Sequence, residues 1–131
     1  MSVVGLVEAI AGIEWVDADR DAVAGALADV RMVRGWLDSV EICAARRLGE
    51  LAALCPAMFP EQVAAEAGRV SLTEASKGFE RAETVAAIPE MGVVLDEGQT
   101  SGAHVDVVTR AMRPLTADQR TGLSSVARCW R

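Results

Sequence analysis

Apolar residues recur every three or four positions along most of the chain, which is the spacing of one face of an α-helix. The longest such pattern covers residues 19–54. Counted in heptads from Val23, all of its ten a and d positions except Arg47 are apolar: Val23, Ala26, Val30, Val33, Leu37, Val40, Ala44, Arg47, Leu51 and Leu54. The pattern therefore predicts one helix over residues 19–54, about 50 Å long at 1.5 Å per residue.

Polar and cyclic residues mark where this helix begins and ends. Asp17 or Asp19 is placed to cap its first turn, because a short side-chain oxygen can accept the free backbone N–H groups there. Pro56 ends it, since proline has no N–H for the helical ladder. A shorter amphipathic helix is expected before it, within residues 2–14.

In the rest of the chain, helix-capping residues and prolines occur at shorter intervals, which predicts a module of short helices over residues 60–131. Ser71 with Glu74 forms a capping box, Pro89 and Pro114 interrupt helices, and Thr116 caps the last one. The expected short helices cover residues 60–67, 71–88, 90–95, 101–113 and 116–130. No strand-like alternation occurs, so the fold class is all-α, a single domain over residues 1–131. Because the last helical pattern stops without an end signal, we expect a fragment of a longer protein.

A helix of this length needs a partner along its apolar stripe. The stripe residues expected at such an interface are Val23, Val30, Val33, Leu37, Val40 and Leu51. Two arrangements satisfy the stripe: an intramolecular bundle with the short-helix module, or a homodimer through the long helix. The sequence leaves both open.

Composition and charge narrow the class of protein. Half the residues are apolar, which is typical of a globular chain, and no apolar run approaches the roughly 18 residues that span a membrane. We therefore expect a cytoplasmic protein with no membrane partner. The net charge of -6 lies entirely in residues 1–66, while residues 67–131 hold eight acidic and eight basic residues.

Basic residues in the second half are the candidates for DNA contact. They are Lys77, Arg81, Arg110, Arg113 and Arg120. Such side chains can neutralise phosphates, and binding of that kind weakens steeply with salt. A solvated helical face is the competing interpretation.

No catalytic constellation, cofactor motif or metal-ligand set is found, and no small-molecule substrate is evident. His104 is the single histidine and is expected to be a packed or capping imidazole. Cys43, Cys55 and Cys129 lack ligand spacing and are expected to be buried, reduced thiols. The Asp17–Asp21 acids lack the glycine and the final glutamate of a calcium loop.

The run RAETVAAIPEMGVVLDEGQTSGAHVDVVTRAMRPL, residues 81–115, resembles the pattern "RA..L..LP.L...L..G.IS..HA..IA.AL..L" of the 13E12 repeat family (domain of unknown function 222) of actinobacteria. The matching positions are Arg81, Ala82, Ile88, Pro89, Leu95, Gly98, Ser101, His104 and Leu115. Thr100 and Val105 depart from it. The likeness covers roughly residues 43–131. A weaker likeness links the same turns to the helix-turn-helix region of ParB-type partition proteins.

The 13E12 resemblance implies an all-helical region that precedes an HNH endonuclease domain in a longer parent protein. An HNH site needs paired His and usually Asn around a metal, whereas this chain has one His and no Asn. The resemblance therefore implies a non-catalytic accessory domain that engages DNA or associates with itself. The alternative is a purely structural oligomerisation or protein-interaction domain that uses the stripe between residues 23 and 54.

Overall fold

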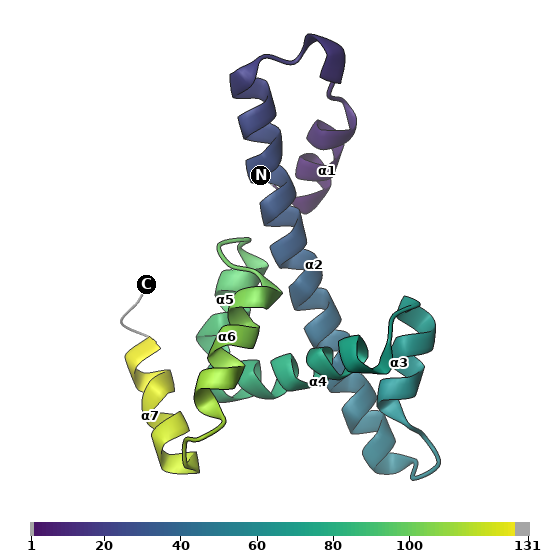
Figure 1. Cartoon of the computed structure of the whole chain (residues 1–131), viewed down its shortest axis with the longest axis vertical. Helices are drawn as coiled ribbons and strands as arrows, with labels where there is room; N and C mark the ends of the chain where they lie inside the picture. The colour runs from purple at the N-terminus through teal and green to yellow at the C-terminus, as the bar shows by residue number, and fades with distance from the viewer. Residues whose placement is uncertain (1, 128–131) are drawn as a thin grey trace.

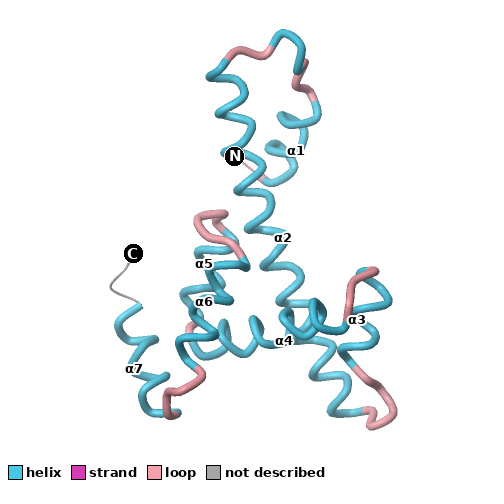
Figure 2. Tube along the Cα trace, in the orientation of Figure 1, coloured by secondary structure: helices cyan, strands magenta, loops and turns pink. Residues whose placement is uncertain are grey.

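A computed structural model describes residues 2–127 of the chain, and these residues form helices joined by short loops (Figures 1 and 2). The prediction of an all-α fold is confirmed. The elements are α1 (Val3–Ala11), the 3-10 turn η1 (Trp15–Asp17), α2 (Arg20–Leu54), α3 (Pro60–Gly68), α4 (Leu72–Ala87), α5 (Pro89–Asp96), α6 (Gly102–Met112) and α7 (Ala117–Ala127). The predicted course of the last helix to Trp130 lies partly outside the described residues.

The long helix α2 begins and ends where the sequence predicts. Of the two candidate caps, Asp19 is the one used: its Oδ1 accepts a hydrogen bond from the Ala22 backbone N–H at 2.8 Å. At the other end Cys55 has an extended backbone directly before Pro56, as expected of a residue that precedes proline.

Local capping also fixes two of the shorter helices. Ser71 Oγ accepts from the Glu74 N–H at 3.1 Å at the start of α4. Before α7, Thr116 and Gln119 form a reciprocal capping box, each side chain accepting from the other residue's backbone N–H.

The end of α3 differs from the prediction. Gly68, expected to close the helix, is its last helical residue, and Arg69 takes the left-handed conformation with φ 53° and ψ 45°. A residue with a Cβ is strained there by about 1–2 kcal/mol, because Cβ approaches the following carbonyl oxygen.

The hydrophobic core lies where α2, α4, α5 and α6 meet. Its buried residues are Ile42, Ala82, Ile88, Met91, Leu95, Val105 and Met112. Pro89 ends α4 and starts α5 within one residue, which turns the chain and brings Ile88 and Met91 to the same side. Leu95 and Val105, one on each side of the next turn, are fully buried.

Two glycines allow the loop between α5 and α6 to lie directly on α2. Gly98 has φ +69°, and a Cβ there would stand 2.6 Å from Met32 Cα. A Cβ on Gly35 would stand 2.7 Å from the Thr100 carbonyl oxygen. A Cβ on Gly25 or on Gly49 would meet no heavy atom within 4 Å. Of these three glycines of α2, only Gly35 therefore allows a close approach.

The molecule is elongated, because the first turns of α2 extend past the short-helix module and have α1 packed beside them (Figure 1). Leu6 of α1 and Ala26 of α2 are the buried residues of this end. Among the described residues, no helix combines the length and the apolar character needed to cross a membrane.

Candidate functional site

Arg81 and Asp106 form a bidentate ion pair between α4 and α6. Arg81 Nε donates to Asp106 Oδ1 at 2.7 Å, and Nη2 donates to Oδ2 at 2.8 Å. Their side chains are only 15% and 25% exposed. Paired in this way, Arg81 has its charge and its fork of donors directed into the protein, so it is a structural residue and not an open phosphate contact.

Each partner shifts the pKa of the other. The hydrogen bonds from Arg81 lower the pKa of Asp106, against the opposing effect of burial, and the Arg81 charge lowers it further. The hydrogen bonds to Asp106 raise the pKa of Arg81, again against burial. The charges of Lys77 and Arg110 also lower the Asp106 pKa, so both lie near this carboxylate.

A second carboxylate fixes the beginning of α6. Asp38 of α2 accepts a hydrogen bond from the Gly102 backbone N–H at 2.6 Å, which caps the positive end of the helix from another element. Gly102 also lies against the Arg81 guanidinium, because a Cβ on it would stand 2.7 Å from Nη1. Ser39, the residue after Asp38 in α2, donates a hydrogen bond to Asp96 at the end of α5. We call Asp38, Arg81, Gly102 and Asp106 the helix junction.

The structure places the five predicted DNA contacts on α4, on α7 and on or directly after α6, and three of them lie beside carboxylates. Lys77 Nζ lies 3.1 Å from Glu74, and Arg113 Nη2 lies 3.3 Å from Glu80. Arg81 is paired with Asp106, and Arg120 Nη2 donates to the Arg113 carbonyl oxygen. The positive charges of Lys77, Arg81 and Arg113 are therefore partly compensated, which leaves them less available for contacts to phosphates.

The single histidine sits at the first turn of α6. Ser101 Oγ and His104 Nδ1 are 3.0 Å apart, and His104 is exposed. The two side chains thus contact each other at the start of the helix, and the imidazole is exposed instead of packed. Within residues 2–127, no group of three His, Cys or carboxylate side chains could hold a metal ion.

The cysteines correct one expectation. Cys43 and Cys55 are both exposed free thiols, not buried ones. The reason is that α2 turns other faces toward α1 and toward the short helices, which leaves Cys43 on the outside. Cys129 lies outside the described residues.

Comparisons with protein-family models, with curated proteins and with solved structures found no match. The likeness to the 13E12 family therefore depends on the residues of the 81–115 run themselves. The structure assigns most of them a part in the fold. Ala82, Ile88 and Leu95 are buried, Pro89 starts α5, and Gly98 adopts a positive φ. Ser101 is the N-cap of α6, and Leu115 packs on the core.

The predicted interface stripe of α2 is divided into a covered and an open part. Val30 and Val33 are partly buried beside α1, and Val23 is 37% exposed. Leu51 is partly buried near α3. Between these ends the stripe is open: Leu37 is 46% and Val40 44% exposed, and Ala44 is exposed.

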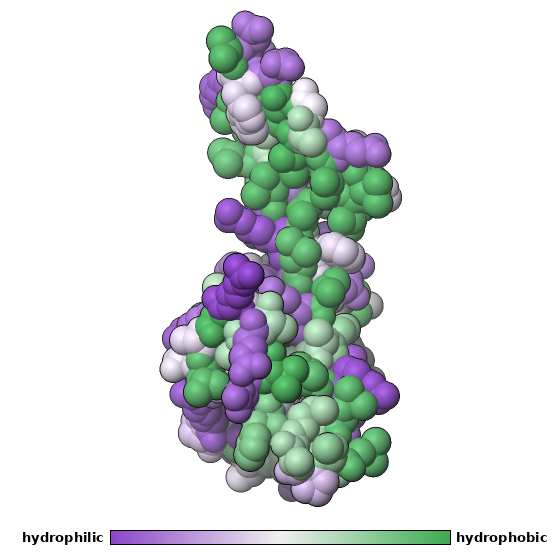
Figure 3. Space-filling model, turned by 90° about the vertical axis from the view of Figure 1, so that its right-hand side faces the viewer, coloured by the Kyte–Doolittle hydropathy of each residue, from purple (hydrophilic) through white to green (hydrophobic). Residues whose placement is uncertain are grey.

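We call Leu37, Val40 and Ala44 the α2 window. These residues share one face with Val33 and Leu48, because their spacing follows the helical repeat. Figure 3, which looks onto the side that carries α1 and α3, shows apolar residues running along the length of the molecule. The window belongs to α2, and the described part of the chain leaves Leu37 and Val40 about half exposed.

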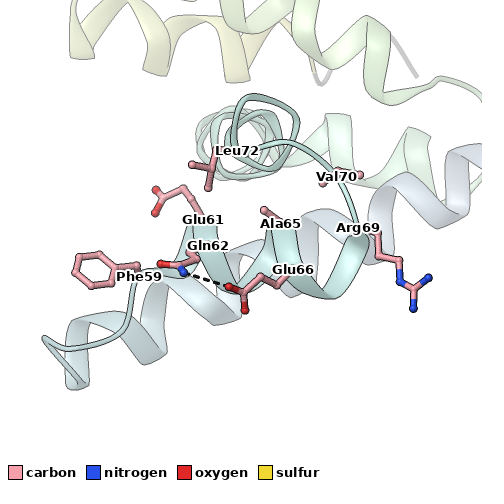
Figure 4. A pocket seen from close by; sticks show the side chains of 8 residues that line it. All are labelled: Phe59, Glu61, Gln62, Ala65, Glu66, Arg69, Val70 and Leu72. Carbon is pink, nitrogen blue, oxygen red and sulfur yellow. Dashed lines mark hydrogen bonds between the residues drawn. The ribbon is translucent and has the colours of Figure 1, made fainter.

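An open groove of about 710 Å³ lies between α3 and the start of α4 (Figure 4). Ala65, Val70 and Leu72 form its apolar part. Its polar residues do not converge on a common point: Gln62 donates to Glu66 at 3.1 Å, and Arg69 points away from the groove in Figure 4. The groove has the character of an apolar contact surface and lacks the converging polar groups of a substrate site.

Sequence reasoning missed three residues of the helix junction, namely Asp38, Gly102 and Asp106. Asp38 and Asp106 lie 64 and 4 positions from Gly102, and nothing in the local pattern distinguishes them from other helical acids. The one available signal was Gly102, directly after Ser101, because a glycine at the first position of a helix leaves room for a side chain from another element.

Proposed function

We propose that this chain is the non-catalytic helical accessory domain of an HNH-endonuclease-like protein and that it acts by self-association. The family part of the proposal is supported by the likeness of residues 81–115 to the 13E12 pattern. The self-association is supported by the large solvent-accessible surface area of the molecule.

The chain exposes far more surface than a compact monomer of its mass. Its accessible surface is 8767 Å² for 13.8 kDa, whereas a compact monomer of that mass exposes about 6,600 Å². The difference is about 2,100 Å², and a standard protein interface removes about 800 Å² from each partner. A protein–protein contact of ordinary size is therefore well within the surplus. This surplus is the observation that carries the proposal.

The surplus surface is also apolar in the right places. Large apolar side chains remain exposed on α1, α2, α3 and α4 and at Phe59, directly before α3: Val4, Val7, Leu37, Val40, Leu54, Phe59, Val63 and Leu72. Contiguous apolar surface of this kind is typical of interaction sites. DNA engagement, the other version of the accessory role, has less support because Arg81, Arg113 and Lys77 are each paired with a carboxylate.

Sedimentation velocity over a wide range of protein concentration tests the proposal. We expect a species heavier than 13.8 kDa that dissociates on dilution. A monomer at every concentration would overturn self-association. A fluorescence anisotropy titration with duplex DNA at low salt is the companion experiment, in which we expect no binding. Binding that weakens steeply with added salt would instead support DNA engagement through the predicted basic residues.

A further inference from the structure

We propose that the α2 window of one copy receives the α2 window of a second copy, with the two long helices crossing at a steep angle instead of running side by side. This inference rests on the proposed self-association and adds to it the surface, the partner element and the geometry.

The first argument is that neighbouring helices block a lengthwise pairing. Helices α1 and α3 both pack on α2 and lie on the same side of it in Figure 1. Val33 and Leu48, at the two ends of the open stretch, are partly buried on that side. A second helix laid along α2 would meet α1 at one end and α3 at the other. The continuous heptad pairing over residues 23–54 is therefore obstructed in this fold.

The second argument is that the open stretch has the size of one crossing helix. From Val33 to Leu48 the helix advances about 22 Å, and an α-helix with its side chains is about 10–12 Å wide. The floor of this gap is the α2 window, and its flanks are α1 and α3. A gap of this length has room for the face of one crossing helix.

The third argument is that α2 itself is the helix that fits. A two-fold contact pairs the same patch of both copies, so each surface must be complementary to itself. The window is the outward face of α2, with Leu37 and Val40 half-exposed, while the opposite face of the same stretch packs on α4, α5 and α6. When two such faces cross at their windows, each window lies between the partner's α1 and α3.

Substitution of the window tests the surface. In the full chain, Val40→Arg places a charge at the crossing point, and we expect it to abolish the heavier species in sedimentation velocity. The matched control is Val107→Arg on α6, where the native side chain is 53% exposed; it should associate as the unmodified chain does. Far-UV circular dichroism checks that both variants fold. If Val40→Arg still associates, the window is wrong while self-association stands.

Disulfide trapping tests the crossing. With Cys43, Cys55 and Cys129 changed to serine, Val40→Cys should form a covalent dimer on oxidation, because a disulfide needs Cα atoms about 4.4–6.8 Å apart. Val23→Cys should not, since it lies about 25 Å along the helix from the crossing point. Equal trapping of both variants would show a lengthwise parallel pair. Trapping of a Val30→Cys/Leu51→Cys double variant would show a lengthwise antiparallel pair. Either result, or no trapping at Val40, overturns the crossing.

Discussion

Among single residues, Arg81 and Asp106 have the largest electrostatic consequence for the fold. Their two hydrogen bonds join α4 to α6 across a part-buried contact. A pair of this kind contributes to the stability of the fold because each charge is compensated by the other. Removal of one partner leaves the other charge without compensation. Arg81 is thus a fold-stabilising residue within a motif that the sequence alone would assign to DNA contact.

Asp106→Asn should destabilise the protein by about 2 kcal/mol at neutral pH, because the hydrogen bonds lost are those to a charged group. The folded-state pKa of Asp106 is lowered from its ordinary value of 3.8. The contribution is therefore complete above that value and is lost as the pH falls through the lower folded-state pKa. Urea unfolding at neutral and at strongly acidic pH measures both effects.

Glu8→Gln on the exposed side of α1 is the control for this experiment, and it should change the unfolding free energy little at either pH. The prediction fails if Asp106→Asn destabilises the protein by the same amount in acid as at neutral pH.

Arg69 carries backbone strain that a glycine would relieve. Its left-handed conformation penalises any residue with a Cβ, so Arg69→Gly should stabilise the protein by about 0.5–1 kcal/mol despite the greater freedom of glycine in the unfolded chain. Thermal unfolding measures the change. Ala67→Gly, two residues earlier and inside α3, should instead destabilise by up to about 1 kcal/mol. Equal effects of the two substitutions would contradict this explanation.

Among the elements, α2 is the one on which most of the others pack. Its faces contact α1, α3, α4, α5 and α6. At Met32 and Gly35 the contact is very close, since the loop before α6 lies with its backbone directly on the helix there. A methyl group added to a glycine of α2 is therefore tolerated at one position and rejected at another, depending on which neighbouring element faces that glycine.

Gly35→Ala and Gly25→Ala are a matched pair that measures this difference. A Cβ on Gly35 would stand 2.7 Å from a backbone oxygen, so we expect about 1–3 kcal/mol of destabilisation from overpacking. A Cβ on Gly25 would meet nothing within 4 Å, so the higher helix propensity of alanine should stabilise by about 0.5–1 kcal/mol. Urea unfolding of the two variants gives both values, and changes of the same sign would refute the close approach.

The molecule has an elongated form whose surface exceeds that of a compact protein of its mass. An elongated α2 with short helices at its sides leaves many apolar residues exposed, and residues of α1, the α2 window and α3 are among them. The self-association that we propose would remove part of this surface from water without a change in the fold of either chain.

The thermal midpoint should consequently depend on protein concentration. Ligand-like stabilisation by a second subunit grows with concentration, because only the folded chain takes part in the association. We expect the midpoint measured by circular dichroism to rise with concentration for the unmodified chain and to stay constant for Val40→Arg. A midpoint independent of concentration for both proteins would argue for a folded monomer.

The sequence by itself determined where the helices lie. Helical spacing, side-chain caps and prolines are local properties, so α2, the cap at Ser71 and the turn at Pro89 follow from residues within a few positions of each other. The all-α class, the Thr116 cap and the burial of Val105 and Met112 in α6 were predictable for the same reason.

Only the tertiary structure decided which faces meet. The partners of Arg81 and Gly102 lie 25 and 64 positions away, and helical periodicity carries no information about a contact at that separation. The same holds for the stripe of α2: its spacing showed an apolar face, but whether α1, α3 or a second chain covers each part depends on where the other helices pack. Local patterns specify elements, whereas the pairing of their faces is a property of the assembled chain.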